Sequence, residues 1–144
     1  MTLKQHVTIT TVLSLLLGFF WKNYSGVVLF WLGGIFIDVD HYFDYVRETG
    51  DVSISLRRME ELFLSFKEKK FYGLFHSYEL VLIGLLVNFF YVKSECLYGL
   101  LAGLGTHLSL DALFNPVRAR FYFFLYRLNH SFDINKGVKQ KNGN

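Results

Sequence analysis

The sequence predicts an all-α fold: an integral membrane helical bundle of about four short transmembrane helices, with amphipathic helices on the cytoplasmic face. Apolar residues make up 52% of the chain and charged residues only 19%, which leaves little polar surface to solvate a 16.8 kDa globule. The charges also leave four uncharged stretches rich in Leu, Val, Ile and Phe, at residues 5–21, 23–37, 80–92 and 96–110. A soluble helical bundle with buried apolar helices is the alternative fold.

Each uncharged stretch is short for a membrane span. At about 1.5 Å per residue, fifteen helical residues extend roughly 22 Å, less than the roughly 30 Å of the hydrocarbon core. We therefore expect flanking Lys side chains to reach the interface, and Trp21 and Trp31 to lie in the interfacial belt. The first stretch ends in the bulky residues 19–22 and offers no small-residue cleavage site, so we interpret it as an uncleaved span.

The distribution of positive charge predicts the orientation of the spans. If the N-terminus is cytoplasmic and the spans alternate, thirteen of the 15 Lys and Arg residues lie in inner segments, and only Lys22 and Lys93 lie in outer turns. This is a strong positive-inside bias. We expect both termini to face the cytoplasm from a cell (inner) membrane, with the basic segments on anionic lipid headgroups and no nucleic acid bound.

The segment between the second and third stretches predicts a surface helix. Apolar residues recur there at helical spacing while charged residues occupy the other faces, which is typical of an amphipathic helix lying on the bilayer. Basic residues of this segment are candidates to hold an anionic group of a substrate, with lipid headgroups as the alternative partner. The apolar positions are Val52, Leu56, Met59, Phe63 and Phe66, and the basic candidates are Arg57, Arg58, Lys69 and Lys70.

The segment after the fourth stretch predicts a second surface helix. Asn115 and Pro116 resemble an N-cap followed by a proline in the first helical turn, so we expect an interfacial helix over residues 117–128. The sequence becomes polar from Ser131 onward. We therefore predict one membrane-embedded domain over residues 1–130 and a flexible tail over residues 131–144.

Small and polar residues form rows within the apolar stretches. In the fourth stretch Gly99, Gly103, His107 and Asp111 follow one another every four residues, so they share one ridge of a helix. Small residues on such a ridge let membrane helices approach closely, either within the bundle or across a dimer. The other stretches and their flanks carry the rows His6-Thr10-Ser14-Gly18, Gly26-Phe30-Gly34-Asp38 and His76-Leu80-Gly84-Asn88.

The ionisable ends of these rows all fall on one side of the membrane. With alternating spans, His and Asp residues from four helices meet near the cytoplasmic boundary, and ionisable residues in apolar segments are functional candidates because their burial is costly. Imidazole and carboxylate ligands suit zinc, manganese or iron, so we predict one or two divalent ions, with zinc first. The predicted metal ligands are Asp38, His41, His76, His107 and Asp111, and the predicted catalytic residues, completing the shell or acting as general base, are Asp40 and His6.

The ordered motifs resemble those of the YdjM-type membrane-bound, metal-dependent hydrolases. Residues 33–41 resemble that family's Gly-x-x-x-Pro-Asp-x-Asp-His, residues 75–77 its Thr-His-Ser, and residues 107–111 its His-x-x-x-Asp on a glycine-rich helix. His6 fits an early histidine of the family, and the resemblance covers residues 1–116. It implies a hydrolase distantly similar to zinc-dependent phospholipase C, which is an all-helical fold with a His/Asp metal cluster.

Two positions depart from the family pattern. The proline before the first aspartate is Ile37 here, and the His-Arg that often precedes the glycine equivalent to Gly73 is absent. The departures leave two function classes open. The leading hypothesis is a hydrolase of phosphoesters, including phospholipids or lipid-linked phosphates, that uses a metal-activated water. The alternative is a non-catalytic membrane protein, either a metal-binding sensor or a scaffold that recruits a partner through residues 117–128 and the tail.

Three further interpretations remain open. A metal transporter is less favoured, because transport sites usually lie near the membrane midplane and these ligands gather at one face. Glu79, one turn beyond His76, is either a ligand, an orienting group or an ordinary first-turn carboxylate. His130 is interpreted as a surface residue, and the single cysteine, Cys96, excludes an internal disulfide framework.

Overall fold

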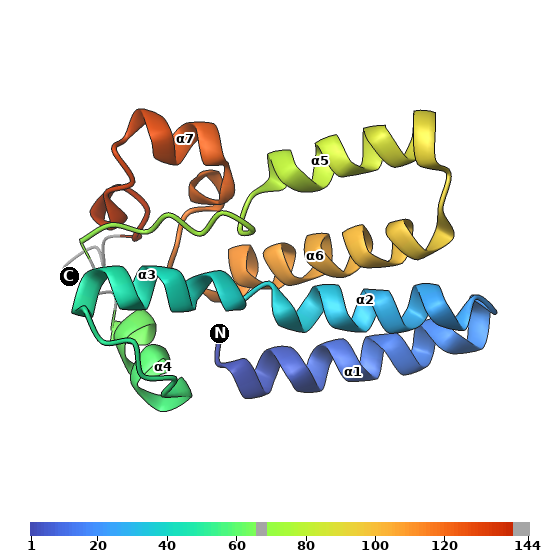
Figure 1. The fold of residues 1–144 in the computed structure, drawn as a ribbon, viewed down its shortest axis with the longest axis horizontal. Coiled ribbons are helices and arrows are strands. Elements are labelled where there is room, and N and C mark those ends of the chain that lie inside the picture. The colour runs from blue at the N-terminus through green and yellow to red at the C-terminus, as the bar shows by residue number, and fades with distance from the viewer. Residues whose placement is uncertain (66–68, 140–144) are drawn as a thin grey trace.

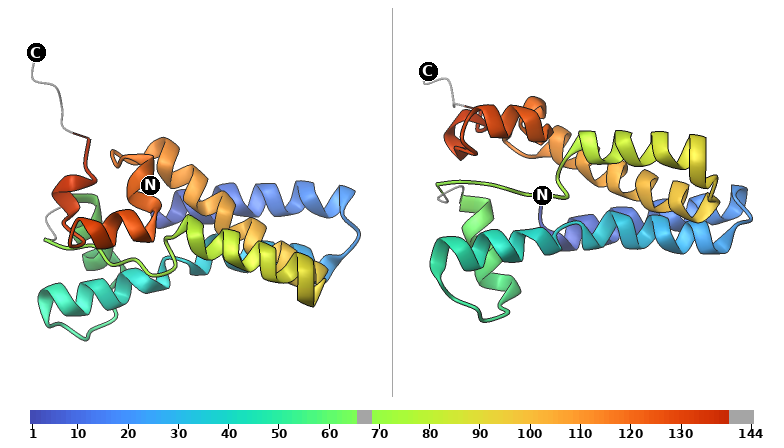
Figure 2. Two further views of the ribbon diagram at one scale, coloured as in Figure 1. Left: turned by 90° about the horizontal axis from the view of Figure 1, so that it is seen from above. Right: turned by 45° about the horizontal axis from the view of Figure 1, so that its top comes forward.

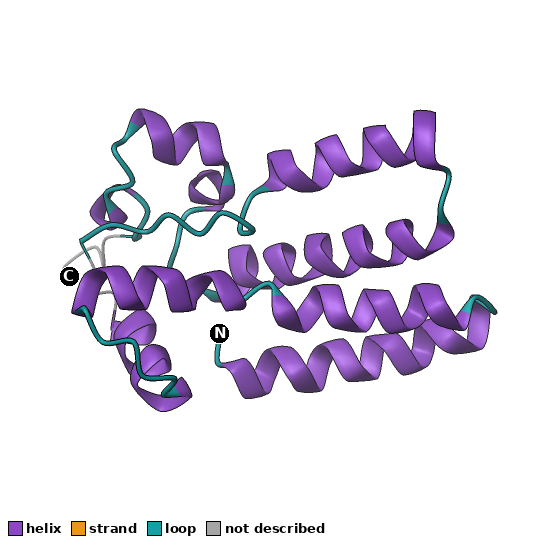
Figure 3. Ribbon diagram, viewed as in Figure 1, coloured by secondary structure: helices purple, strands orange, loops and turns teal. Residues whose placement is uncertain are grey.

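The protein is helical throughout the part of the chain that the structure, a computed structural model, describes, which is residues 1–65 and 69–139 (Figures 1 and 3). Within those residues no strand forms, and β pairing is limited to isolated bridges such as Val117 with Val138. The elements are α1 (Leu3–Phe20), α2 (Tyr24–Phe36), α3 (Val39–Thr49), α4 (Leu56–Ser65), α5 (Tyr78–Val87), the π-helical turn η1 (Asn88–Val92), α6 (Glu95–Phe114), η2 (Ala119–Tyr122), α7 (Phe124–Asn129) and η3 (Ile134–Lys136).

Four helices form an elongated bundle, and the remaining elements gather at one end of it. α1, α2, α6 and α5 lie side by side, and α3 continues the direction of α2 beyond the bundle (Figures 1 and 2). α4 lies on one side of α3, and α7 with the 3-10 turns lies on the other (Figure 1). The N-terminus lies at this end of the bundle (Figure 1). The starts of α1 and α5 and the ends of α2 and α6 lie at the same end.

Capping side chains begin the bundle helices at defined residues. Thr2 and Gln5 form a capping box at the start of α1, and the Asn23 side chain accepts a 2.9 Å hydrogen bond from the Gly26 amide at the start of α2. The hydroxyl of Ser94 accepts a bond from the Leu97 amide and begins α6. These caps satisfy backbone amides that would otherwise lack partners at each helix start.

The closest helix packing in the bundle is between α2 and α6, and glycines make it possible. A Cβ atom on Gly99 would collide with the carbonyl oxygen of Gly26, and one on Gly103 would collide with the carbonyl oxygen of Phe30. The row of small residues predicted for α6 is therefore buried within the bundle against α2. This contact holds the ends of α2 and α6 together, and the candidate site is built there.

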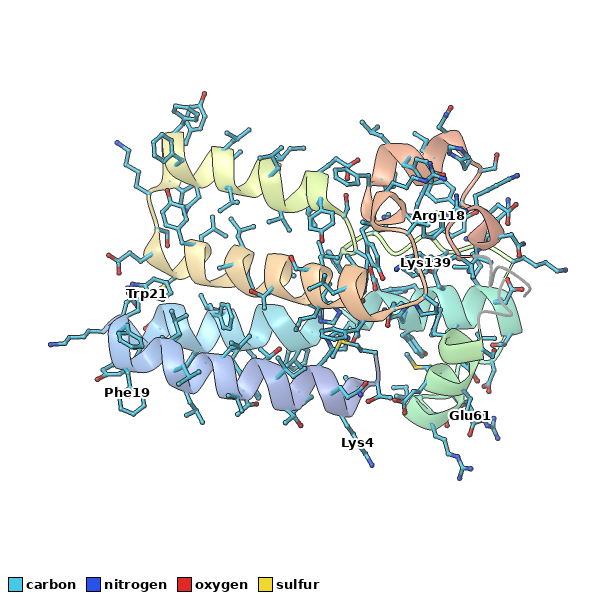
Figure 4. All side chains as sticks on the ribbon, turned by 180° about the vertical axis from the view of Figure 1, so that it is seen from behind. Lys4, Phe19, Trp21, Glu61, Arg118 and Lys139 are labelled. Atoms are coloured by element: carbon cyan, nitrogen blue, oxygen red, sulfur yellow. The ribbon has the colours of Figure 1, made fainter. Side chains whose placement is uncertain are left out.

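Polar residues face inward in the bundle and large apolar residues face outward. Thr10 and Asn88 have no exposed surface, whereas Phe20 is 86% exposed and Tyr91 is 83% exposed. An apolar outer surface of this kind suits a lipid environment. Figure 4 shows Phe19 and Trp21 at the far end of the bundle, and Lys4, Arg118 and Lys139 toward the opposite end.

Three helical segments are long and apolar enough to cross a membrane: α1, the continuous segment Tyr24–Thr49 and α6. The apolar segment Tyr78–Val92 is shorter, so the structure confirms an all-helical protein with candidate membrane spans but not the predicted count of four. The predicted amphipathic segment forms α4, where Met59 is buried; Phe66 of that prediction lies outside the described residues.

The C-terminal segment differs from the predicted helix and flexible tail. Instead of one helix over residues 117–128, the chain runs extended past Val117 and then forms η2 and α7. The Arg118 amide donates to the carbonyl of Gly137, and the Lys139 amide donates to the carbonyl of Pro116, so residues 131–139 fold back onto this strand-like stretch. Ile134 is only 3% exposed and belongs to the core, so residues 131–139 of the predicted tail pack against the rest of the domain.

Candidate metal centre

The predicted ligands meet where the bundle ends. Asp38 lies in the turn between α2 and α3, and His41 follows on the first turn of α3. His107 lies on α6 beside the close contact of α2 and α6, and His76 lies in the loop before α5. His6 of α1 and Asp111 of α6 complete the cluster, and their side chains are joined by a 2.9 Å contact between Nε2 and Oδ1.

Three imidazole rings point their Nε2 atoms at one carboxylate oxygen. The Oδ1 atom of Asp38 lies 3.2 Å from Nε2 of His107, 3.4 Å from Nε2 of His76 and 3.5 Å from Nε2 of His41. A second carboxylate faces two of the same nitrogens: Oδ2 of Asp111 lies 3.5 Å from Nε2 of His107 and 3.8 Å from Nε2 of His76. The donor atoms of several elements thus converge on one small volume.

The Nε2 atoms of His76 and His107 are buried and have no hydrogen-bond partner. The other nitrogen of each ring is hydrogen-bonded: Nδ1 of His107 lies 2.9 Å from the carbonyl oxygen of Gly34, and Nδ1 of His76 lies 3.2 Å from Oδ2 of Asp40. Because a carbonyl and a carboxylate only accept, each Nδ1 carries a proton and donates it. When the ring is neutral, its Nε2 lone pair therefore faces the cluster, as in metal-ligating histidines.

The donor set fits a divalent cation. The cluster contains three groups of three residues. Within each group, every residue offers one nitrogen or carboxylate oxygen, and these atoms lie within 4.8 Å of one another. The groups overlap, because the first and second share His107 and the second and third share His76. Buried imidazole nitrogens beside several carboxylates can hold a divalent ion, because together they offer ligand atoms and compensating negative charge. The three groups are His6–His107–Asp111, Asp38–His76–His107 and Asp40–His41–His76.

Burial by itself would lower the pKa of His76, but the carboxylates of Asp40 and Asp38 outweigh it and raise that pKa to about 10. At neutral pH His76 therefore carries a proton on both ring nitrogens when no ion is bound. A divalent ion would have to displace the Nε2 proton to bind there, so binding would release that proton.

Asp40, predicted as a catalytic residue, orients His76 and holds a loop. Its Oδ2 atom accepts a 3.2 Å hydrogen bond from Nδ1 of His76 and a 2.8 Å hydrogen bond from the Phe75 amide. One turn further along α3, Asp44 accepts bonds of 3.0 and 2.9 Å from the Tyr72 and Gly73 amides. Asp44 was not predicted from the sequence, although its spacing of four residues from Asp40 places both on one helix face.

Arg127 holds the same loop from the other side. Its fully buried guanidinium donates to the carbonyl oxygens of His76, Phe121 and Gly73 at 2.7, 2.8 and 2.9 Å. Burial lowers the pKa of Arg127 to about 10, so the group stays positive at neutral pH. From the sequence this residue was predicted to lie in an interfacial helix, because an arginine within an aromatic segment is equally typical of lipid contact.

His6 lies against the ring of His107 as well as bonding Asp111. The two ring centroids are 3.9 Å apart and the rings are nearly parallel. Nδ1 of His6 is buried without a partner, as is Nδ1 of His41. His6 thus lies against His107 and Asp111 with one buried ring nitrogen free of hydrogen bonds.

Other residues that the sequence singled out lie away from this cluster. Glu79 accepts hydrogen bonds from the amides of Phe124 and Leu125, so it caps the start of α7. Nδ1 of His130 lies 2.8 Å from the Tyr126 carbonyl oxygen. The four basic candidates are all exposed: Arg57 pairs with Glu61, Arg58 pairs with Asp51, and Lys69 and Lys70 lie beyond α4.

A cavity of about 470 Å³ opens onto the cluster. Its volume lies within the range of small-molecule sites. Asp38, His41, His76 and Asp111 form its polar end, and the rest of its wall is mostly apolar. None of the four basic candidates lines it.

Comparison with known proteins returned no matching family model, no similar curated protein and no similar solved structure.

Proposed function

We propose that the protein is a metal-dependent hydrolase whose centre is the cluster of Asp38, His76, His107 and Asp111. The observation that carries the proposal is the pair of buried, unpartnered Nε2 atoms of His76 and His107, both aimed at carboxylates at the polar end of a ligand-sized cavity. A structural histidine cluster would have its ring nitrogens hydrogen-bonded. A purely structural ion would need no adjoining cavity.

The chemistry divides between the ion and the side chains. When bound, the ion lowers the pKa of its water to about 7 and polarises the ester under attack. Asp38 and Asp111 supply the negative charge that holds it, and Asp40 fixes the ring of His76. His6, bonded to Asp111 and with a free buried Nδ1, is placed to accept a proton from the attacking water.

A phosphoester, including a phospholipid or lipid-linked phosphate, is the proposed substrate class. An anionic group would be met by the ion, because the described residues that line the cavity include no Lys or Arg. We propose that the apolar segment Tyr78–Val92 acts as a fourth span, with η1 and flanking residues reaching the interface. The site then lies at the cytoplasmic face, where most of the basic residues fall by the positive-inside bias.

Turnover assays on purified protein test the hydrolase. Wild type loaded with zinc, manganese or iron should hydrolyse at least one member of a panel of phosphomonoesters, phosphodiesters and phospholipids. Asp38→Asn and His76→Ala should lose activity by more than the 10–100-fold that is typical of residues that only orient a ligand. His130→Ala, outside the cluster, should retain it. Metal-independent turnover, or equal activity in all variants, would contradict the proposal.

A non-catalytic metal-binding sensor or scaffold is the second candidate. The C-terminal segment favours it in one respect, because Leu125 and Leu128 are 66% and 52% exposed and offer an apolar surface to a partner. Tight metal binding without turnover of any ester in the panel would favour this function over the hydrolase.

A further inference from the structure

The cavity beside the cluster has two chemically distinct ends. Its polar end is formed by His and Asp side chains, whereas most of the remaining wall comes from apolar residues of the start of α1, the α2–α3 junction, α4, the loop before α5 and the segment after α6. Apolar walls of this extent favour a hydrocarbon occupant over a hydrated one. The apolar lining includes Met59, Phe63, Phe71, Val117, Phe121 and Ile134.

The mouth of the cavity is apolar as well. Ile54, just before α4, lines the cavity and is 80% exposed. Phe36 and Val39, at the junction of α2 and α3, also line it and are 57% and 48% exposed. Phe43, one turn beyond Val39, extends the same exposed apolar surface along α3. The opening is thus continuous with the apolar exterior of the α2–α3 segment, from which a lipid chain can enter without crossing water.

Charge around the cavity points the same way. Outside the His/Asp cluster, the charged groups on the described residues that line it are the Glu60 carboxylate and the N-terminal ammonium of Met1, which lies 3.7 Å from Asp111. No Lys or Arg side chain among the described residues lines the cavity. Away from the cluster, binding energy would therefore come from burial of apolar surface, at roughly 25 cal/mol per Å².

We propose that this cavity holds the hydrocarbon chain of an amphiphilic ester, which enters between α4 and the α2–α3 junction and places its polar head at Asp38, His76 and Asp111. The inference rests on the proposed hydrolase, and it assigns substrate selection to chain length and not to a basic headgroup pocket. Ile54 lies at the mouth, and Met59 lies deeper in the wall.

Photolabelling in lipid nanodiscs tests the position of the chain without requiring turnover. The probe is a single-chain palmitoyl phospholipid with a diazirine near the chain end. Labelled peptides from α4 and from residues 117–138 are expected, and excess unlabelled palmitoyl lysophospholipid should reduce them. Ile54→Trp narrows the mouth and should reduce this labelling at least fivefold. Val52→Trp is the matched control, because Val52 is 72% exposed on the same segment and does not line the cavity.

Labelling confined to the outer surfaces of α1 and α5, or unaffected by Ile54→Trp, would overturn the inference. Kinetics with esters that differ only in chain length separate it from the proposed function. The hydrolase should prefer palmitoyl over butanoyl chains in kcat/KM, and Met59→Trp should lower that preference. Metal-dependent turnover without chain preference contradicts the cavity assignment alone, whereas labelled cavity residues without turnover contradict the hydrolase alone.

Discussion

The helix bundle and the loop that carries His76 are held in place by different interactions. Along the bundle, α2 and α6 meet through glycines, and the contact is backbone against backbone. At the site end, buried charged side chains bond to backbone groups of the loop at residues 72–76: Asp40 and Asp44 from one side, Arg127 from the other. Close packing positions helices, whereas charged hydrogen bonds position a loop that has no regular structure of its own.

The difference shows how the site is kept in place. His107 and Asp111 inherit their positions from α6, which is fixed by its contact with α2. His76 depends on a loop, so its position requires the three charged residues that hold that loop. Variants in the bundle should therefore disturb the packing of α2 against α6, whereas variants of the three charged residues should disturb the position of His76.

Removal of Arg127 should have the largest effect on stability. Arg127→Met leaves three buried carbonyl oxygens without their donor and removes the positive charge that faces three carboxylates, Asp40 among them. We expect the free energy of unfolding to fall by about 3–5 kcal/mol. Thermal unfolding in detergent, followed by circular dichroism, measures it. Arg120→Met, an exposed position in the same segment, is the control, and an equal loss in both variants would contradict the role given to Arg127.

Glycine substitutions test the bundle end. Gly103→Ala places a methyl group against the carbonyl oxygen of Phe30 and should destabilise the protein by about 1–3 kcal/mol. Gly105→Ala is the matched control on the same helix, because its methyl group would approach nothing closer than 3.6 Å. That variant should be neutral or more stable by up to about 1 kcal/mol. Similar losses in both would show that helix propensity, and not close approach, decides.

Asp40→Asn separates ligand orientation from loop anchoring. Nδ1 of His76 and the Phe75 amide both donate to Oδ2 of Asp40, and Oδ1 lies 3.0 Å from the same Nδ1. An asparagine NH2 group in the place of Oδ1 would set a donor against that donor, so the ring loses its fixed orientation. We expect metal affinity to fall about 10–100-fold, measured by competition with a chelator. Asp44 anchors the same loop without a hydrogen bond to His76, so Asp44→Asn should lower the metal affinity less. The reverse order of the two affinities would contradict the orienting role of Asp40.

The exposed arginines of α4 should have the smallest effect. The side chain of Arg57 is 89% exposed and that of Arg58 is 66% exposed, and each pairs with a surface carboxylate. Surface pairs of this kind contribute little. Arg57→Ala and Arg58→Ala should leave the thermal midpoint and metal content unchanged. A strong loss of turnover in either variant would restore them as substrate contacts and would show that the cavity is not the binding path.

Periodic features were predictable from the sequence and tertiary anchoring was not. The spacing of Gly99, Gly103, His107 and Asp111 places them on one ridge, and the structure buries all four. Arg127 carried no such signal, because its partners are carbonyl groups of a loop whose path no repeat specifies. Ile134 is a single apolar residue in a polar stretch, so its burial follows from the fold-back of the segment and could not be read from periodicity.

The number of membrane spans depends on helix length as well as on composition. The apolar character of residues 80–92 was evident, yet the helix there is shorter than the other three candidate spans. For a segment of this length, the flanking residues decide whether the helix crosses the membrane. Cysteine accessibility on the two sides of the membrane, with single cysteines at residues 93 and 22 in a Cys96→Ser background, would place both turns on the outer face if there are four spans.

The most direct test of the metal centre is the metal content per chain, measured by mass spectrometry on detergent-purified protein after reconstitution. We predict one or two tightly held zinc, manganese or iron ions in the wild type and in His130→Ala. His107→Ala and Asp111→Ala should lose them, because each removes a ligand atom from the converging set. A wild type without metal, or equal metal in His107→Ala and His130→Ala, would show that the buried His/Asp cluster is not a metal site.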